Sequence, residues 1–309
     1  MPERFDAVNT MRDFVHLHLH SEYSLLKGAC RISKLPAAVL SRGQKAVAVT
    51  DLGVMYGCAD FSDACVRAGV KPIIGCELAV DFDGVSGSVV LLVTDAAGYG
   101  NLTRLVTLSC ISGKNVPQDE LFSHSGGLIC LSGGKRGPLN ILSDRDDREG
   151  ARALAGKLRG VFGENFYIEL EKQGLEGQGY SNEFLISVSR SAGIPPVACN
   201  DVFYIEKADA GTRETLSCIG DGRTVSEGRE PGFETDEFYL RSSEEMENLF
   251  GHIPEALDNT VKIAEKCSFE LKPGKTVLPE YVTPNGEKPD SYLRRIAFEG
   301  YEKAVSEGR

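Results

Sequence analysis

The sequence predicts an α/β fold of the barrel type, and two features of the chain lead to this expectation. Short apolar runs alternate with amphipathic stretches of helical period, so that roughly seven strand signals are separated by helices. Several runs end in an acidic residue, as at Glu77 and Asp201, and functional residues gather at the C-terminal ends of strands in parallel α/β folds. Periodicity alone does not separate a closed barrel from an open doubly wound sheet.

The first strand is expected in the N-terminal run of alternating residues. His16, His18 and His20 alternate there with aliphatic residues, and a side-chain period of two places the three imidazoles on one face. Burial of imidazoles is unfavourable unless something pairs with them, and a metal ion is a common partner. The alternative is an edge strand whose histidines are solvated.

The remaining elements follow in order along the chain. A helix is expected to begin with Ser33 as N-cap and Pro36 in its first turn, and to end near Gly43. The next expected elements are a strand at 46–50, a helix at 58–68 closed by Gly69, a strand at 72–80, a hairpin return strand at 88–94, a helix at 99–112, strands at 128–132, 166–170 and 196–199, and helices at 148–158 and 182–192.

Beyond residue 204 the pattern becomes mainly helical. Helices are expected at 208–218, 243–249, 254–267 and 289–307, with a Pro-rich extended linker at 276–285. The expected organisation is an N-terminal tail at 1–12, a barrel at 13–207, a helical extension of the same domain at 208–275, and a linker with the start of a truncated further segment at 276–309.

Composition restricts the class of protein. The net charge of −11 disfavours a main nucleic-acid-binding surface, because acidic surfaces repel phosphate. No apolar run approaches the ~20 residues of a membrane span, and the N-terminus has no signal-peptide core. The nine cysteines are odd in number and form no Cys-x-x-Cys pair, which favours reduced core cysteines in a cytoplasmic protein over a disulfide framework.

Six segments of the chain carry a resemblance to a known family. They are residues 18–26 (HLHSEYSLL), 48–51 (AVTD), 71–77 (KPIIGCE), 98–102 (GYGNL), 127–133 (GLICLSG) and 199–204 (CNDVFY). In this order and at this spacing they resemble the PHP (polymerase and histidinol phosphatase) domain, in the form found at the N-terminus of bacterial replicative DNA polymerase III α subunits. The resemblance implies a distorted seven-stranded (β/α) barrel of PHP type followed by a mainly helical extension.

The resemblance also implies a metal-ligand set. Metal-binding members of the family use nine ligand positions around a trinuclear cluster, and this chain keeps four of them as His18, His20, Glu77 and Asp201. The other five positions are degraded: Lys27 stands for an aspartate, Leu52, Ser88 and Phe203 for histidines, and Gly134 for a cysteine.

The four retained residues belong, by family analogy, to one of the three metals. Two imidazoles and two carboxylates suffice for one divalent ion, zinc or manganese. The alternative is that they are buried hydrogen-bonding residues without a metal. Lys27 is expected to place a cation where another metal would lie, His16 is expected to be a core histidine, and Asp51 is expected to orient the barrel mouth.

Multi-metal phosphoester hydrolysis needs several ions, so the resemblance implies a catalytically decayed phosphoesterase. The implied role is structural support and docking of the proofreading exonuclease subunit within the polymerase III holoenzyme, with weak DNA binding, no membrane contact and the polymerase catalytic residues beyond residue 309. The chain alone is then inactive, although its parent is a DNA-directed DNA polymerase. Two alternatives remain: an active metal-dependent phosphoesterase or 3′-5′ exonuclease of the PHP family, and a metal-stabilised interaction module unrelated to replication.

Overall fold

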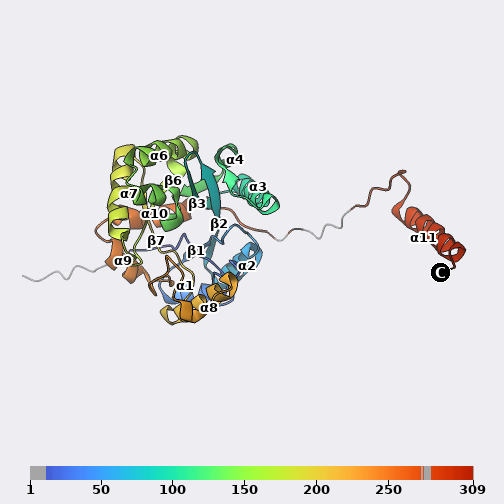
Figure 1. The fold of residues 1–309 in the computed structure, drawn as a ribbon, viewed down its shortest axis with the longest axis horizontal. Coiled ribbons are helices and arrows are strands. Elements are labelled where there is room, and N and C mark those ends of the chain that lie inside the picture. Colours follow the sequence, from blue (N-terminus) through green and yellow to red (C-terminus); the bar gives the residue numbers. More distant parts are fainter. Residues whose placement is uncertain (1–11, 273, 275–279, 309) are drawn as a thin grey trace, which may run out of the picture. The chain divides into compact units, whose positions relative to one another are not determined.

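Seven strands form one curled mixed sheet, shown in Figure 1. The computed structural model describes residues 12–272, 274 and 280–308. The strands are β1 (Ala46–Val49), β2 (Lys71–Phe82), β3 (Val85–Val93), β4 (Val116–Pro117), β5 (Leu128–Leu131), β6 (Phe166–Glu171) and β7 (Pro196–Cys199). Their order is β1-β2-β3-β5-β6-β7, and β4 pairs with β2 outside this path.

The sheet is mixed because β3 runs opposite to its neighbours. β3 is antiparallel to both β2 and β5, whereas the pairs β1–β2, β5–β6 and β6–β7 are parallel. The tight turn at Asp83 and Gly84 makes the hairpin, and Gly84 has the positive φ of 82° that such a turn requires. The predicted PHP-type α/β fold and its hairpin are therefore confirmed, while an all-parallel strand arrangement is wrong.

The N-terminal segment lies between β1 and the chain that follows β7. The amide of Ala48 donates to the carbonyl oxygen of His16 at 2.8 Å, and the amide of His20 donates to the carbonyl oxygen of Val202 at the same distance. Isolated parallel bridges, rather than a regular strand, join His16 to Val47 and Leu19 to Val202. This segment thus joins the two ends of the curled sheet, as a barrel requires.

Helices cover the outside of the sheet (Figure 1). The helices of the barrel unit are α1 (Leu35–Ser41), α2 (Cys58–Ala68), α3 (Ala96–Ser112), α4 (Gln118–Ser123), α5 (Pro138–Asp144), α6 (Arg148–Phe162), α7 (Gln178–Ala192), α8 (Ala210–Asp221), α9 (Ser243–Phe250) and α10 (Pro254–Lys266). A further helix, α11 (Pro289–Ser306), belongs to a separate unit. Short 3₁₀ turns lie at η1 (Gly134–Arg136), η2 (Gly163–Asn165), η3 (Lys207–Asp209) and η4 (Val225–Glu227). Each helix expected from the sequence is present, with ends shifted by a few residues.

Two helix ends test the capping arguments. Gly69 closes α2 with a φ of 76°, as predicted from its place after the apolar pattern. The N-cap of α1 is Lys34 rather than the predicted Ser33, and no side chain caps that end. Pro36 does lie in the first turn of α1, where its missing N–H has no intrahelical partner to lose.

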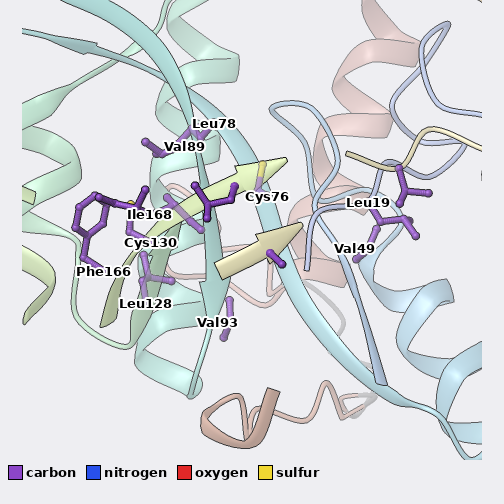
Figure 2. Close-up of a cluster of buried hydrophobic side chains, with 14 of the residues drawn as sticks. Leu19, Val49, Cys76, Leu78, Val89, Val93, Leu128, Cys130, Phe166 and Ile168 are labelled. Atoms are coloured by element: carbon purple, nitrogen blue, oxygen red, sulfur yellow. The ribbon is translucent and has the colours of Figure 1, made fainter. Parts of the chain in front are cut away.

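The core lies between the sheet and the helices. Figure 2 shows aliphatic and aromatic side chains from several strands, among them Leu78, Val89, Cys130 and Ile168, meeting in one cluster. All nine cysteines are free thiols, and all but Cys110 are buried. The interpretation of the cysteines as reduced core residues therefore agrees with their positions.

The helical extension packs against the barrel within the same compact unit, which ends at Leu271. Asn259 of α10 donates to the carbonyl oxygen of Pro196 at 2.7 Å, and Thr260 accepts the amide of Val15 at 3.2 Å. A second unit, residues 272–309, contains α11. Residues 1–11 and 275–279, which hold most of the predicted tail and part of the predicted linker, lie outside the described residues. Among the described residues, no helix is both long and apolar enough to span a membrane.

Candidate metal centre

Four side chains from distant parts of the chain meet at one point of the barrel. His18 and His20 come from the N-terminal segment, Glu77 from the middle of β2, and Asp201 from two residues beyond β7. One donor atom from each lies within 4.8 Å of the others, and all four side chains are buried. These are the four residues that the sequence predicted to converge.

The donor atoms have spacings that suit a small divalent ion. Nε2 of His18 lies 2.9 Å from Oε2 of Glu77 and 3.7 Å from Oδ1 of Asp201, and Nε2 of His20 lies 3.3 Å and 2.9 Å from the same two oxygens. Tetrahedral zinc with bonds of about 2.0–2.1 Å separates its ligands by about 3.4 Å. Two imidazoles and two carboxylates are also an accepted donor set for zinc. The residues therefore fit one ion.

Glu169 of β6 holds the imidazole of His18 from the other side. Its Oε1 lies 2.8 Å from Nδ1 of His18, and both side chains are fully buried. A carboxylate at one ring nitrogen fixes the tautomer and directs the other nitrogen toward the site, as in many metal centres. Glu169 was not predicted from the sequence, although the apolar run 166–171 has acids at two alternate positions, 169 and 171, that would lie on one face of a strand.

Glu171, two residues further along β6, is a second acid near His18. Its Oε1 lies 3.8 Å from Nδ1 of His18 and has no hydrogen-bond partner among the described residues. Burial, and then the negative charges of Glu169 and Asp201, raise the pKa of Glu171 to about 8. The site therefore contains more carboxyl groups than the four predicted ligands provide.

Arg136 supplies a cation that contacts three members of the four-residue set. Its Nε and Nη2 atoms donate to Glu77 at 2.8 and 2.7 Å, and Nη1 lies 3.0 Å from Oδ2 of Asp201. Nη2 also lies 3.4 Å from Nε2 of His20, and the guanidinium lies 5.4 Å from the ring centroid of Phe203. Arg136 was missed as well, although it follows the glycine pair at the C-terminal end of β5.

The charges at the site shift the pKa values of its members. Burial alone would raise the pKa of Glu77, but the charge and hydrogen bonds of Arg136 hold that pKa well below its usual range. Burial would lower the pKa of His18, but Glu169 and Asp201 raise it well above 6.5.

The side chains at the degraded ligand positions differ from those of the family pattern, and a second buried group that could hold an ion is formed by His18, Glu169 and Glu171. The ring of Phe203 stacks on His20 with centroids 4.3 Å apart, and the backbone of Leu52 forms an isolated bridge with Glu77. Ser88 lies on β3 and lines a cavity together with Arg136. A Cβ atom at Gly134 would lie 2.2 Å from Oε1 of Glu171, so this position is filled by the glutamate of β6.

Lys27 pairs with two carboxylates that lie outside the four-residue set. Its Nζ lies 3.1 Å from Oδ1 of Asp221 and 3.0 Å from Oε1 of Glu230, and no contact with the four-residue set is seen among the described residues. These two carboxylates, on α8 and the loop after it, hold the ammonium away from the centre. The expectation that Lys27 places a cation where another metal would lie stays a prediction, and the cation that contacts the four-residue set is Arg136.

His16 and Asp51 lie beside the centre without belonging to it. His16 is fully buried, and its Nε2 pairs with the carbonyl oxygen of Arg241 at 2.8 Å. Asp51 accepts the amide and hydroxyl of Ser21 at 2.7 Å and the hydroxyl of Ser24 at 2.6 Å. The first arrangement is that of a core histidine, and the second organises the loop that follows His20.

A cavity of about 480 Å³ opens beside the four-residue set. Its lining includes Arg136, Glu171 and Asp201 from the centre, together with Lys135 and Phe233, but neither His18 nor His20. A small ligand entering this cavity would therefore meet the guanidinium of Arg136 before it reached the histidines.

Comparisons with known proteins agree on one family. The model of the PHP domain matches residues 16–173. DNA polymerase III subunit alpha of Pseudomonas fluorescens is 37% identical over 301 residues, which cover 95% of this chain and 26% of the relative. The same subunit of Treponema pallidum is 38% identical over 304 residues, covering 93% and 26%. The chain thus spans about a quarter of the length of these relatives.

Solved structures give a more distant likeness. A two-domain protein of Bacteroides vulgatus that contains a predicted PHP-like metal-dependent phosphoesterase is 14% identical, with a TM-score of 0.43. The match covers 81% of this chain and 65% of that one.

Proposed function

This chain belongs to the PHP domain family, and from that premise we propose that it is the N-terminal PHP module of a replicative DNA polymerase III α subunit whose phosphoesterase site has decayed. The family match and the α-subunit relatives support the first part. The state of the ligand positions supports the second. The module works in the cytoplasm and takes part in DNA replication as a portion of a DNA-directed DNA polymerase.

One observation carries the proposal of decay: the retained ligands form a single set, and a protein cation already lies on it. Two-metal and three-metal hydrolysis needs one ion to activate water and others to hold the phosphate. Here Gly134 and Phe203 offer no donor, and Arg136 contacts both carboxylates of the remaining set. The loss of donors at Gly134 and Phe203 and the cation of Arg136 beside the set support the binding of one ion rather than a hydrolytic cluster.

The proposed cofactor is one divalent metal, zinc or manganese, held by His18, His20, Glu77 and Asp201. When bound, such an ion supplies a structural cross-link and, in sites with an open position, Lewis-acid chemistry. The protein's own contribution is the orientation of His18 by Glu169 and the exclusion of water by burial. The ligands come from three distant segments, so their joining stabilises the closure of the barrel.

The proposed role of the module is to support the polymerase body and to dock the proofreading exonuclease subunit. The net charge of −11 supports protein partners over DNA, because phosphate is repelled by an acidic surface. Exposed apolar side chains, among them Leu25, Tyr56, Ile111 and Ile219, offer contact area on the barrel unit. Polymerase catalysis lies in the remainder of the holoenzyme.

An activity assay tests the decayed site. Purified protein with added zinc or manganese should show no hydrolysis of phosphomonoesters or DNA 3′ ends above background. The alternative function is an active phosphoesterase or 3′-5′ exonuclease, and the cavity beside the four-residue set is the observation that favours it. Turnover that disappears in His20→Ala would establish that alternative.

A binding assay tests the partner. In filter binding at ~150 mM salt, primed DNA should bind weakly, because non-specific DNA affinity falls steeply with salt. In a pull-down under the same conditions, the proofreading exonuclease subunit should bind specifically. Tight DNA binding without exonuclease binding would reverse the proposal.

A further inference from the structure

We propose that Arg136 is an internal substitute for the metal ion: its guanidinium fills the four-residue set when no ion is bound, and the two cations occupy the set alternately. The inference rests on the single-metal centre of the proposed function. The guanidinium of Arg136 competes with the ion and so lowers the apparent metal affinity. In the metal-free protein, the same group keeps the barrel folded.

The contacts of Arg136 overlap the metal-facing atoms at one oxygen, Oε2 of Glu77, and reach the second oxygen of Asp201, beside the Oδ1 that faces the histidines. Oε2 of Glu77 lies 2.7 Å from Nη2 of Arg136 and 2.9 Å from Nε2 of His18. The other carboxylate, Asp201, is paired through Oδ2 at 3.0 Å. Each predicted carboxylate ligand is thus engaged by the guanidinium, and an ion at the centre would meet its positive charge within a few ångströms.

The surrounding charges explain why a cation is needed there. Four buried carboxyl groups lie close together, from Glu77, Glu169, Glu171 and Asp201. An uncompensated buried carboxylate is strongly unfavourable, and removal of its partner destabilises the fold. A guanidinium remains protonated throughout the working range of pH and forms several directed hydrogen bonds, so it compensates these charges without a metal.

The placement of Arg136 allows its side chain to leave while the backbone stays. The backbone on either side is fixed, because the amide of Gly133 donates to Glu169 at 3.1 Å and the amide of Lys135 donates to Glu171 at 3.0 Å. The Arg136 side chain itself is 34% exposed and lines the cavity. Rotation of the side chain into that cavity would vacate the centre without moving η1.

The proposal separates metal binding from folding. A chain with no internal cation would depend on the metal, as small zinc domains do. With Arg136 present, metal-free protein keeps its carboxylates paired, and the metal must displace a bound cation to enter. The apparent affinity is then the intrinsic affinity multiplied by the fraction of molecules in which the guanidinium has left the site.

The test compares Arg136→Gln with wild type and with Lys135→Gln, which removes the neighbouring charge in the same cavity. Zinc and manganese affinities are measured by calorimetric titration of protein freed of metal with chelator, and melting temperatures are recorded with and without metal. Arg136→Gln should bind about tenfold more tightly or better, because the competing charge is gone. It should also melt lower than wild type without metal and show a larger metal-induced rise, while Lys135→Gln resembles wild type.

The outcomes distinguish the two proposals. If wild type and Arg136→Gln bind metal equally well, the competition is refuted and the single-metal centre stands. If Arg136→Gln binds more weakly than wild type, Arg136 supports the ion and the competition is again refuted. If neither protein binds metal, the single-metal centre itself fails. The double variant Arg136→Gln/Asp201→Ala should bind metal more weakly than Arg136→Gln alone. Such a loss would place the ion at the four-residue set.

Discussion

A Cβ atom on Gly134 would lie 2.2 Å from Oε1 of Glu171, so the carboxyl group of this β6 residue occupies the space that a side chain at position 134 would need. Gly134 also has a φ of 54°, which disfavours any side chain there. The family resemblance places a cysteine ligand at this position. In this chain a cysteine side chain at position 134 and the carboxyl group of Glu171 would therefore need the same space.

The first prediction is that restoring the cysteine destabilises the protein. Gly134→Cys should lower the free energy of unfolding by about 1–3 kcal/mol, because overpacking forces neighbouring side chains to shift. It should not create a second metal site, since the added thiol would displace Glu171 rather than face the centre. Chemical denaturation and metal analysis measure the two effects.

Gly156→Ala is the matched control, because a Cβ there meets nothing within 4 Å. It should leave stability unchanged or raise it slightly, as expected for alanine in a helix. The double variant Gly134→Cys/Glu171→Ala should recover part of the loss, since it removes the overlapping carboxyl group but not the strained φ. Full stability in Gly134→Cys alone would refute the packing argument.

A second prediction concerns the positioning of His18. Glu169→Gln keeps the size of the side chain but removes the carboxylate at Nδ1, where the present distance is 2.8 Å. Metal affinity should fall by about 10–100-fold, the usual effect of removing such a partner. Titration of the metal-free protein measures the change, and Glu164→Gln on the exposed turn before β6 is the control. Unchanged affinity would mean that burial alone fixes the imidazole.

The sequence predicted the four converging residues because each lies in a recognisable motif, but it did not predict the residues that act on them. Glu169 and Glu171 stand in an apolar run that reads as an ordinary strand, and only the closed tertiary structure brings their side chains to His18. Arg136 looks like a surface cation from its sequence context. Its role depends on where a 3₁₀ turn directs one long side chain, which no periodicity encodes.

The strand directions show the same limit. Alternating strands and helices predicted a parallel barrel, and the turn at Asp83 and Gly84 was correctly predicted as a hairpin. The hairpin reverses the direction of β3 within the sheet. The predicted hairpin was therefore in conflict with the predicted parallel barrel. Lys27 illustrates the equivalent problem for a side chain, because its partners Asp221 and Glu230 lie about 200 residues away in sequence.

The third prediction is that metal removal lowers stability. Purified protein should hold close to one equivalent of zinc or manganese, and an ion at 100 times its dissociation constant adds about 2.7 kcal/mol. Chelator and Asp201→Ala should both lower the melting temperature, and the Asp201 variant should lose its metal. His16→Ala should also destabilise, because its Nε2 contact with Arg241 is buried, but metal content should not change. Absence of metal together with an unmoved melt would contradict the prediction.

The last prediction concerns the ion-pair network that holds the loop after α8. The side chain of Arg213 is 3% exposed, its guanidinium lies 2.7 Å from Oε2 of Glu230, and its Cζ lies 3.4 Å from the ring centroid of Phe233. Glu230 also accepts from Lys27 and Ser217. Glu230→Gln leaves Arg213 buried without its counter-charge, so it should lower the free energy of unfolding by about 3 kcal/mol, the lower end for a broken buried pair. Lys27→Gln should cost about 1 kcal/mol or less, because Lys27 and Asp221 are partly exposed.

The same network predicts a dependence on pH. Burial would raise the pKa of Glu230, but hydrogen bonds from Ser217 and Lys27 and the charge of Arg213 lower it below its ordinary value. A carboxyl group whose pKa is lower in the folded state stabilises the protein above its unfolded pKa of about 4.3, and this stabilisation is lost as the pH falls through the folded value. Wild type should therefore lose more stability than Glu230→Gln between neutral pH and about pH 3, and the two should converge at the acid end.

Urea denaturation across that range measures the difference, with Glu234→Gln as control because it lies in the same loop without contacting Arg213 among the described residues. A constant gap between wild type and Glu230→Gln at every pH would mean that Glu230 acts through its shape and not through its charge.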